Sequence, residues 1–192
     1  MKRLIMTEMN SYILSTERLV LRRWIDTDVQ PFIDMNKDAD IMKYFPKTLT
    51  DTETMEMIER IKLHFSKNNF GLFAVENKST KQFLGFTGFS MPAFSSFFTP
   101  CIEIGWRFNK EVWRHGFATE AASACIKYGF ENLGFDKIVS FTSIINTGSE
   151  KVMKKIGMEY VADFDHPKIE KSSAICRHVL YEIEKKNWMA GL

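Results

Sequence analysis

The stretch from Trp106 to Phe130, WRFNKEVWRHGFATEAASACIKYGF, joins a strand-like run, a basic turn that contains a glycine, and a helix. Most helices begin at a Ser, Thr, Asp or Asn cap, whereas this one follows Arg114, His115 and Gly116. Glycine lets a backbone approach a ligand closely, and the N–H groups at a helix start carry partial positive charge. The turn therefore predicts an anion site, which suits a diphosphate better than a lone carboxylate. An ordinary solvated helix cap is the competing interpretation.

The length of 192 residues suits a globular protein made of one α/β domain over residues 1–192. A formal net charge of +2 is too small to favour nucleic acid or a membrane surface as the main partner. No run approaches the roughly 18 apolar residues of a membrane span. The N-terminal segment is too polar for a secretion signal. We therefore expect a cytoplasmic protein.

The three cysteines, Cys101, Cys125 and Cys176, are odd in number and widely scattered. They form no CxxC pair, which argues against both a disulfide framework and a zinc site. We expect no metal, and we expect the cysteines to be small buried residues of a reduced protein.

Hydrophobic periodicity and turn signals predict the order of the elements along the chain. Thr50 and Glu53 fit a capping box at the start of one helix, and Gly157 is a natural glycine after the end of another. The expected order is strand, two helices, three strands, helix, strand, helix and two strands, which predicts a mixed sheet with helices on both faces. The expected strands are 18–24, 71–77, 82–89, 101–108, 137–144, 158–164 and 175–184, and the expected helices are 26–38, 49–68, 117–132 and 146–157.

A second motif, NTGSEKVMKKIGM, begins at Asn146 directly after a predicted strand. Together with STERLVLRRW and IGWRFNKEVWRHGFATEAA, it makes the chain resemble the GNAT N-acetyltransferase superfamily, and within it the RimJ/RimL-like branch. The family's acetyl-CoA loop, Gln/Arg-x-x-Gly-x-Gly/Ala, is matched at Gly116 and Ala118. Trp113 stands at its leading basic position, as is common in that branch. The family's Asn-x-x-Ser/Ala and following Gly–apolar pair are matched by Asn146, Ser149, Gly157 and Met158.

The resemblance implies a GNAT-like fold, with a mixed, mostly antiparallel sheet, helices on both faces and a splayed pair of central strands. It implies that acetyl-CoA, without a metal, lies in a slot between the strands 101–108 and 137–144. It also implies that Asn146 hydrogen-bonds the pantetheine amides, although a plain helix N-cap explains this residue as well. The pyrophosphate is expected on the segment Arg114, His115, Gly116, Phe117, Ala118 and Thr119.

Acetyl transfer requires an amine in its neutral form. Deprotonating a lysine-like amine of pKa about 10.4 at pH 7 costs roughly 4–5 kcal/mol, whereas an α-amine near pKa 8 costs only about 1 kcal/mol. A general base is therefore valuable, and Glu103 is our candidate, at about the position where some histone acetyltransferases of the family carry a glutamate base. The competing interpretation is a glutamate that faces solvent or pairs with Arg107. An ordered water or His166 is the next candidate for the base.

Many enzymes of this family place a tyrosine general acid seven residues after the asparagine, and here Met153 occupies that position. The RimJ/RimL-like branch suggests Ser149 in its place, directed toward the sulfur of CoA. An ordinary serine in the first turn of a helix is the competing interpretation. Backbone N–H groups of the slot, among them that of Phe108, are expected to hold the developing oxyanion.

The acceptor side is expected to involve two segments. MPAFSSFFTP brings Phe94 and Phe97 into a loop between prolines, where they form either a wall of the acceptor pocket or a core or subunit contact. DFDHPK lies between the last two strands, which in the family borders the acceptor pocket, and it contributes His166, otherwise a surface histidine. We expect a monomer or a homodimer that acts on a peptide N-terminus or a small-molecule amine.

Two other classes of function compete with an acetyltransferase. A non-catalytic acyl-CoA-binding or sensor protein would keep the basic turn and Asn146 but would need no base. Glu103 argues against this alternative, and the missing tyrosine argues for it. An NAD-type dinucleotide binder is excluded because the turn lacks GxGxxG and an acidic partner for the ribose.

Overall fold

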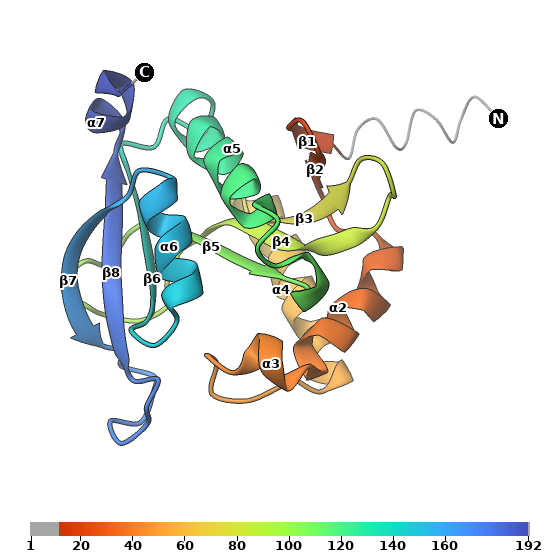
Figure 1. Ribbon diagram of the computed structural model, residues 1–192, viewed down its shortest axis with the longest axis horizontal. Coiled ribbons are helices and arrows are strands. Elements are labelled where there is room, and N and C mark those ends of the chain that lie inside the picture. Colours follow the sequence, from red (N-terminus) through yellow and green to blue (C-terminus); the bar gives the residue numbers. More distant parts are fainter. Residues whose placement is uncertain (1–11, 192) are drawn as a thin grey trace.

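The structure is a computed structural model that describes residues 12–191. The strands are β1 (Tyr12–Ser15), β2 (Leu19–Arg22), β3 (Leu72–Asn77), β4 (Phe83–Ser90), β5 (Glu103–Phe108), β6 (Lys137–Ser143), β7 (Glu159–Asp165) and β8 (Arg177–Glu184). The α-helices are α2 (Val29–Lys37), α3 (Ala39–Met42), α4 (Asp51–Asn68), α5 (Phe117–Glu131), α6 (Thr147–Lys155) and α7 (Lys185–Ala190). Two short 3-10 turns, η1 (Asp26–Asp28) and η2 (Lys110–Val112), precede α2 and α5 (Figure 1).

All eight strands form one sheet in the order β1-β2-β3-β4-β5-β6-β8-β7. Every neighbouring pair is antiparallel except β5 and β6, which run parallel. These two strands share one registered pair, Glu103 with Val139, and the N–H of Val139 donates to the carbonyl of Ile102 at 2.9 Å. Beyond this point they diverge. The predicted mixed sheet and its splayed central pair are therefore confirmed.

Helices cover both faces of the sheet, as the sequence predicted. Phe86 and Phe89 on β4 are three residues apart and therefore point to opposite faces. Phe86 packs against Phe32 of α2, with ring centroids 5.8 Å apart. Phe89 packs against Gly129 of α5, so closely that a Cβ at 129 would come within 2.9 Å of its ring. We call these the α2 face and the α5 face.

Local sequence signals explain how several elements begin and end. The predicted capping box is present at α4, where Thr50 accepts from the N–H of Glu53 and the Glu53 carboxylate accepts from the N–H of Thr50. Gly157, two residues after α6, has the left-handed φ of +83° that ends helices. A turn with Lys81 at φ +61° connects β3 and β4 as the expected hairpin.

Some expectations were incomplete or wrong. The helix expected from Asp26 starts with the 3-10 turn η1, and the sequence analysis did not foresee β1, α3 or α7. Cys125 and Cys176 are buried, as expected, but Cys101 is only half-buried, because it lies in the loop before β5. Within residues 12–191, none of the helices combines the length and the apolar character needed to cross a membrane.

Candidate active site

The basic turn before α5 leaves the start of this helix without a side-chain cap. Arg114 and Gly116 both have left-handed φ angles, +66° and +82°, and Gly116 occupies the N-cap position. Among residues 12–191, no side chain accepts a hydrogen bond from the first N–H groups of α5, which have no partner inside the helix. Arg114, His115 and Gly116 are all exposed. Backbone donors and a cationic side chain thus meet at one exposed point, which is the geometry that binds phosphate.

A clamp that the sequence analysis missed holds this turn against the connection between β1 and β2. The carboxylate of Glu120, in the first turn of α5, accepts from the Thr16 hydroxyl at 2.5 Å and from the Arg18 Nε at 2.6 Å. Arg18 also donates to the carbonyl of His115 at 3.0 Å, and its guanidinium lies 4.3 Å above the centroid of the Phe117 ring. The clamp residues are about a hundred positions apart, so no local pattern could reveal them.

The edge of β5 that faces β6 offers free backbone groups. Asn109 donates its N–H to Leu84 on β4, whereas the carbonyl of Ile102 accepts from Val139 on β6. Backbone groups alternate sides along a strand, so those of residues 104, 106 and 108 also point toward β6. The carbonyl of Phe108 accepts from the Trp113 Nε1 at 2.8 Å. The N–H of Phe108 therefore lies on the open edge of the slot.

Asn146 caps α6, at the end of β6. Its Oδ1 accepts from the N–H of Ser149 at 3.2 Å, and its Nδ2 donates to the hydroxyls of Ser149 and Thr142 at 3.1 and 3.0 Å. The N-cap role is thus present, and both amide hydrogens are engaged within the protein. Because Ser149 Oγ accepts from Asn146, its own hydroxyl proton is free to be donated elsewhere. Met153, where many relatives have tyrosine, is buried in the core.

Glu103, at the start of β5, has no charged partner within 4.0 Å among the described residues. Its carboxylate accepts one hydrogen bond, from the Ser90 hydroxyl at 3.1 Å. Burial raises the pKa of Glu103 to about 7, and the bond from Ser90 offsets only part of this effect. The alternative pairing with Arg107 is absent, since that guanidinium contacts Asn36 and Phe45 instead. A carboxyl group that titrates near neutral pH can act as a general base.

An aromatic cluster with two histidines lies on the same face of the sheet as Glu103. Phe94 packs against the rings of Phe141 and His166, with centroids 5.8 and 4.8 Å away, whereas Phe97 is 68% exposed. His166 is half-buried, so it differs from an ordinary surface histidine. Burial lowers its pKa to about 4, with smaller effects from the nearby His178 and Lys168. The cluster comprises Phe94, Phe98, Phe141, Phe164, His166 and His178.

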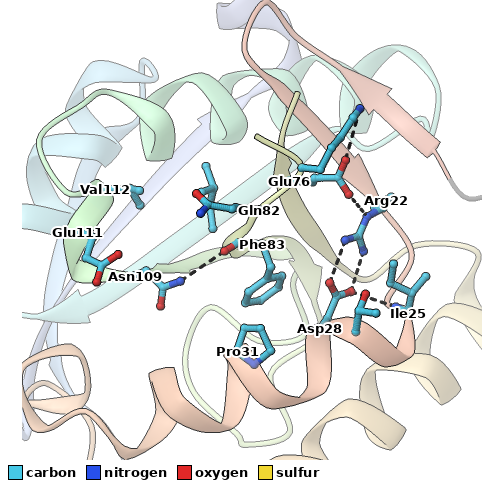
Figure 2. Close-up of a pocket in the computed structure, with 13 residues that line it drawn as sticks. Arg22, Ile25, Asp28, Pro31, Glu76, Gln82, Phe83, Asn109, Glu111 and Val112 are labelled. Carbon is cyan, nitrogen blue, oxygen red and sulfur yellow. Dashed lines mark hydrogen bonds and ion pairs between the residues drawn. The ribbon is translucent and has the colours of Figure 1, made fainter. Parts of the chain in front are cut away.

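The surface of the described residues also has two hollows. The larger, of about 470 Å³, is bordered by Arg22, Asp28 and Glu76, and Figure 2 shows the three side chains pointing toward one another. Arg22 bonds both carboxylate oxygens of Asp28, at 2.6 and 2.8 Å, and Glu76 at 2.9 Å. The smaller hollow, of about 260 Å³, lies between β8 and α7. Because Arg22, Asp28, Glu76 and Lys81 of the larger hollow are paired with one another, we assign no chemistry to it.

Comparison with known proteins identifies the family. Residues 18–159 match the acetyltransferase (GNAT) domain family. The uncharacterized N-acetyltransferase YnaD of Bacillus subtilis is 30% identical over 146 residues, which cover 76% of this chain and 81% of that protein. A crystal structure of a GNAT-family acetyltransferase from Bacillus anthracis is 28% identical, with a TM-score of 0.75 over 90% of this chain and 98% of that chain.

RimL, a ribosomal L7/L12 α-N-protein acetyltransferase solved in complex with coenzyme A, has the same fold at 12% identity. Its TM-score is 0.75, over 90% of this chain and 97% of that chain. At this identity the likeness to RimL shows a shared fold. With three quarters of its length matched by the family, this chain belongs to the GNAT acetyltransferases.

Proposed function

We propose that this protein transfers the acetyl group of acetyl-CoA to a primary amine by direct attack. The observation that carries this proposal is the position of Glu103, a carboxyl group with a pKa of about 7 at the point where β5 and β6 begin to diverge. A protein that only bound acyl-CoA would have no use for such a group. The uncapped start of α5 and the free edge of β5 supply the donors that a CoA pyrophosphate and pantetheine need.

Each residue of the candidate site has its own role in the proposed acetyl transfer. Glu103 accepts the proton that the attacking amine loses, directly or through one water. The N–H of Phe108 donates to the carbonyl oxygen as this oxygen gains negative charge. The carbon–nitrogen bond forms while the carbon–sulfur bond breaks, and the hydroxyl of Ser149 donates a hydrogen bond to the departing sulfur. Arg114, His115 and the N–H groups from Gly116 to Thr119 hold the pyrophosphate. Asn146 accepts a hydrogen bond from the pantetheine at its side-chain carbonyl oxygen, because both hydrogens of its side-chain amide are engaged within the protein.

The acceptor belongs on the α2 face, beside the aromatic cluster. Phe94 and His166 form a wall of the acceptor site, and the exposed ring of Phe97 lies at the edge of this site. Few carboxylates surround this surface, which disfavours a polycation. We therefore expect higher kcat/KM for peptide N-termini or small hydrophobic amines than for aminoglycosides or spermidine.

The test is a thiol-release assay with acetyl-CoA and a panel of peptides, hydrophobic amines, aminoglycosides and polyamines. Thiol release that depends on an added amine supports the transferase. Tight CoA binding by calorimetry without thiol release for any amine would instead favour the sensor. Gly116→Val serves as the control for the binding turn, because valine is strained at a φ of +82° and its side chain would stand where the pyrophosphate is expected. A folded Gly116→Val protein with unchanged CoA affinity would refute this assignment of the turn.

A further inference from the structure

Arg107, near the end of β5, is a buried cation that lacks a carboxylate partner among residues 12–191. The residue is only 9% exposed. Its Nη1 donates to the Oδ1 of Asn36, while its Nε is buried without any hydrogen-bond partner. Its guanidinium lies 4.1 Å from the ring centroid of Phe45 and 5.4 Å from that of Phe86. Of its five N–H donors, one is thus engaged in a hydrogen bond within the described part of the chain.

This arrangement leaves the positive charge without compensation. Aromatic rings attract a cation, but they replace only part of its lost hydration. Burial lowers the pKa of Arg107 to about 10, which is still far above physiological pH. The guanidinium therefore keeps its charge in the folded protein. Buried charges are normally paired, and the described residues offer this one no carboxylate.

Arg107 and Glu103 point to the same face of the sheet, because they are four residues apart on one strand. Gly105 lies between them on that face. A Cβ built on Gly105 would have only the Glu103 Oε1 within 4 Å, at 3.9 Å, so the space above this residue is open. The strand thus presents a carboxyl group, an open floor and a guanidinium group in sequence, and the Cα atoms of its two charged residues are about 13 Å apart.

The ring that covers Arg107 comes from the segment between α3 and α4. Phe45 is itself 39% exposed, so the guanidinium lies beneath a surface ring rather than deep in the core. Asn36, its hydrogen-bond partner, is fully buried and donates to Thr54 of α4 at 3.2 Å. These contacts fix one side of the guanidinium and leave its remaining donors for another group.

We propose that Arg107 binds an anionic group of the amine acceptor, a carboxylate or a phosphate, and that this contact determines specificity. The inference rests on the proposed transferase function, and among the peptides and small amines proposed above it favours those that also carry a negative charge. The amine lies at the Glu103 end of the open floor and the anion at the Arg107 end. Guanidinium groups suit both anions because their N–H donors form a planar fork.

The contact has a structural competitor. Arg107 joins β5 to α2 through Asn36, so it also stabilises the packing of that helix on the sheet. A purely structural arginine would affect stability and the use of all acceptors equally. A specificity contact distinguishes acceptors by charge, and this difference decides between the two roles.

The first experiment uses the unmodified full-length protein and matched pairs of amines. β-Alanine, γ-aminobutyrate and ε-aminocaproate are each compared with their own amides, and aminopropyl phosphate is compared with aminopropanol. In ε-aminocaproate the two groups are far apart, so both members of that pair have nearly the same amine pKa. We expect at least one anionic member to have a kcat/KM tenfold or more above its neutral counterpart. Equal or better use of every neutral member would overturn the proposal.

The second experiment assigns the preference to Arg107. Arg107→Gln should raise the KM for the preferred anionic amine about ten- to a hundredfold and leave that of its neutral counterpart unchanged. Arg107→Lys, which keeps the charge, should retain part of the preference. If Arg107→Gln fails to fold, Arg107→Lys and the comparison of the paired amines with the wild type still distinguish a specificity role from a structural role. A uniform loss for both members of the pair would show a structural role only.

Binding measurements separate failure of this inference from failure of the proposed function. Calorimetry of ε-aminocaproate and its amide on the CoA-loaded protein needs no turnover. Stronger binding of the carboxylate without thiol release would refute the transferase and keep the anion site. Thiol release with every amine, irrespective of its charge, would keep the transferase and refute the anion site.

Discussion

Two arginines are buried in the sheet of this protein, and their surroundings differ. Arg22 on β2 contacts the carboxylates of Asp28 and Glu76, as Figure 2 shows. Arg107 on β5 contacts one amide oxygen and two aromatic rings. Burial alone lowers the pKa of both guanidinium groups. At Arg22 the two carboxylates outweigh burial and raise the pKa, whereas at Arg107 nothing does.

The difference separates charges that hold the fold from charges that await a ligand. The paired group joins β2, β3 and the turn before α2, and each of its members is neutralised by another. On β5, Arg107 is buried and Glu103 is partly buried, and neither has a charged partner among the described residues. Unpaired buried charges cost stability, so we infer that they are retained where a substrate or a proton uses them.

The largest effect on activity is expected when the carboxyl group of Glu103 on β5 is replaced by an amide. Glu103→Gln should lower kcat about 10²–10⁴-fold and leave CoA affinity unchanged, because a general base is lost while the phosphate-binding turn is intact. Steady-state kinetics and CoA calorimetry measure the two quantities. Asp28→Asn, assayed at a temperature where it is folded, is the matched control in the paired group and should keep its kcat. Full activity of Glu103→Gln at pH 7 would place the base elsewhere.

Breaking the paired group should instead cost stability. Asp28→Ala leaves Arg22 with one carboxylate, and removing one partner of a buried ion pair typically lowers the free energy of unfolding by about 3–5 kcal/mol. Urea denaturation monitored by tryptophan fluorescence measures this loss, and Glu103→Gln in the same assay should lose little. A loss below about 1 kcal/mol for Asp28→Ala would contradict the stabilising role of the network.

The pH dependence sharpens the contrast further. Burial raises the pKa of Glu103 from its ordinary 4.5 to about 7, so the folded protein binds this proton more tightly than the unfolded chain does. Stability therefore falls as pH rises from about 4.5 to about 7, and Glu103→Gln lacks this loss. Thermal unfolding should show that Glu103→Gln is more stable than the wild type above pH 7, and that the two differ little at pH 4. The kcat/KM of the wild type should rise with pH through about 7, and a flat profile there would contradict the role of Glu103.

The smallest effect extends the comparison to exposed arginines. Arg18 forms an ion pair with Glu120, whereas the described residues offer Arg114 no such partner, although the two side chains belong to the same turn region. Arg114→Ala should weaken CoA binding by about 1–2 kcal/mol, as the loss of one charge-assisted contact does. Calorimetry with CoA measures the change, and Arg60→Ala on α4 controls for net charge. An equal loss of CoA affinity in Arg60→Ala would mean that Arg114 contributes to binding only through the overall charge of the protein.

The order of the elements and much of the candidate site could be predicted from the sequence, because their signals are local. The capping box at Thr50, the glycine after α6 and the alternation within β5 each depend on residues a few positions apart. The same holds for the basic turn before α5, where the left-handed backbone at position 116 favours glycine. Short-range sterics and capping determine such features whatever the chain does elsewhere.

Only the tertiary structure decided which charges are paired. Asp28 is six residues from Arg22, but Glu76 is 54 positions away from it, and Asn36 is 71 positions from Arg107. The sequence therefore does not indicate that Arg22 contacts two carboxylates, or that Arg107 contacts none among the described residues. The clamp from Arg18 to Glu120 and the free edge of β5 likewise arise from how distant segments meet. The free energy of a charge depends on its burial and on its neighbours in space, and the packing of the sheet sets both.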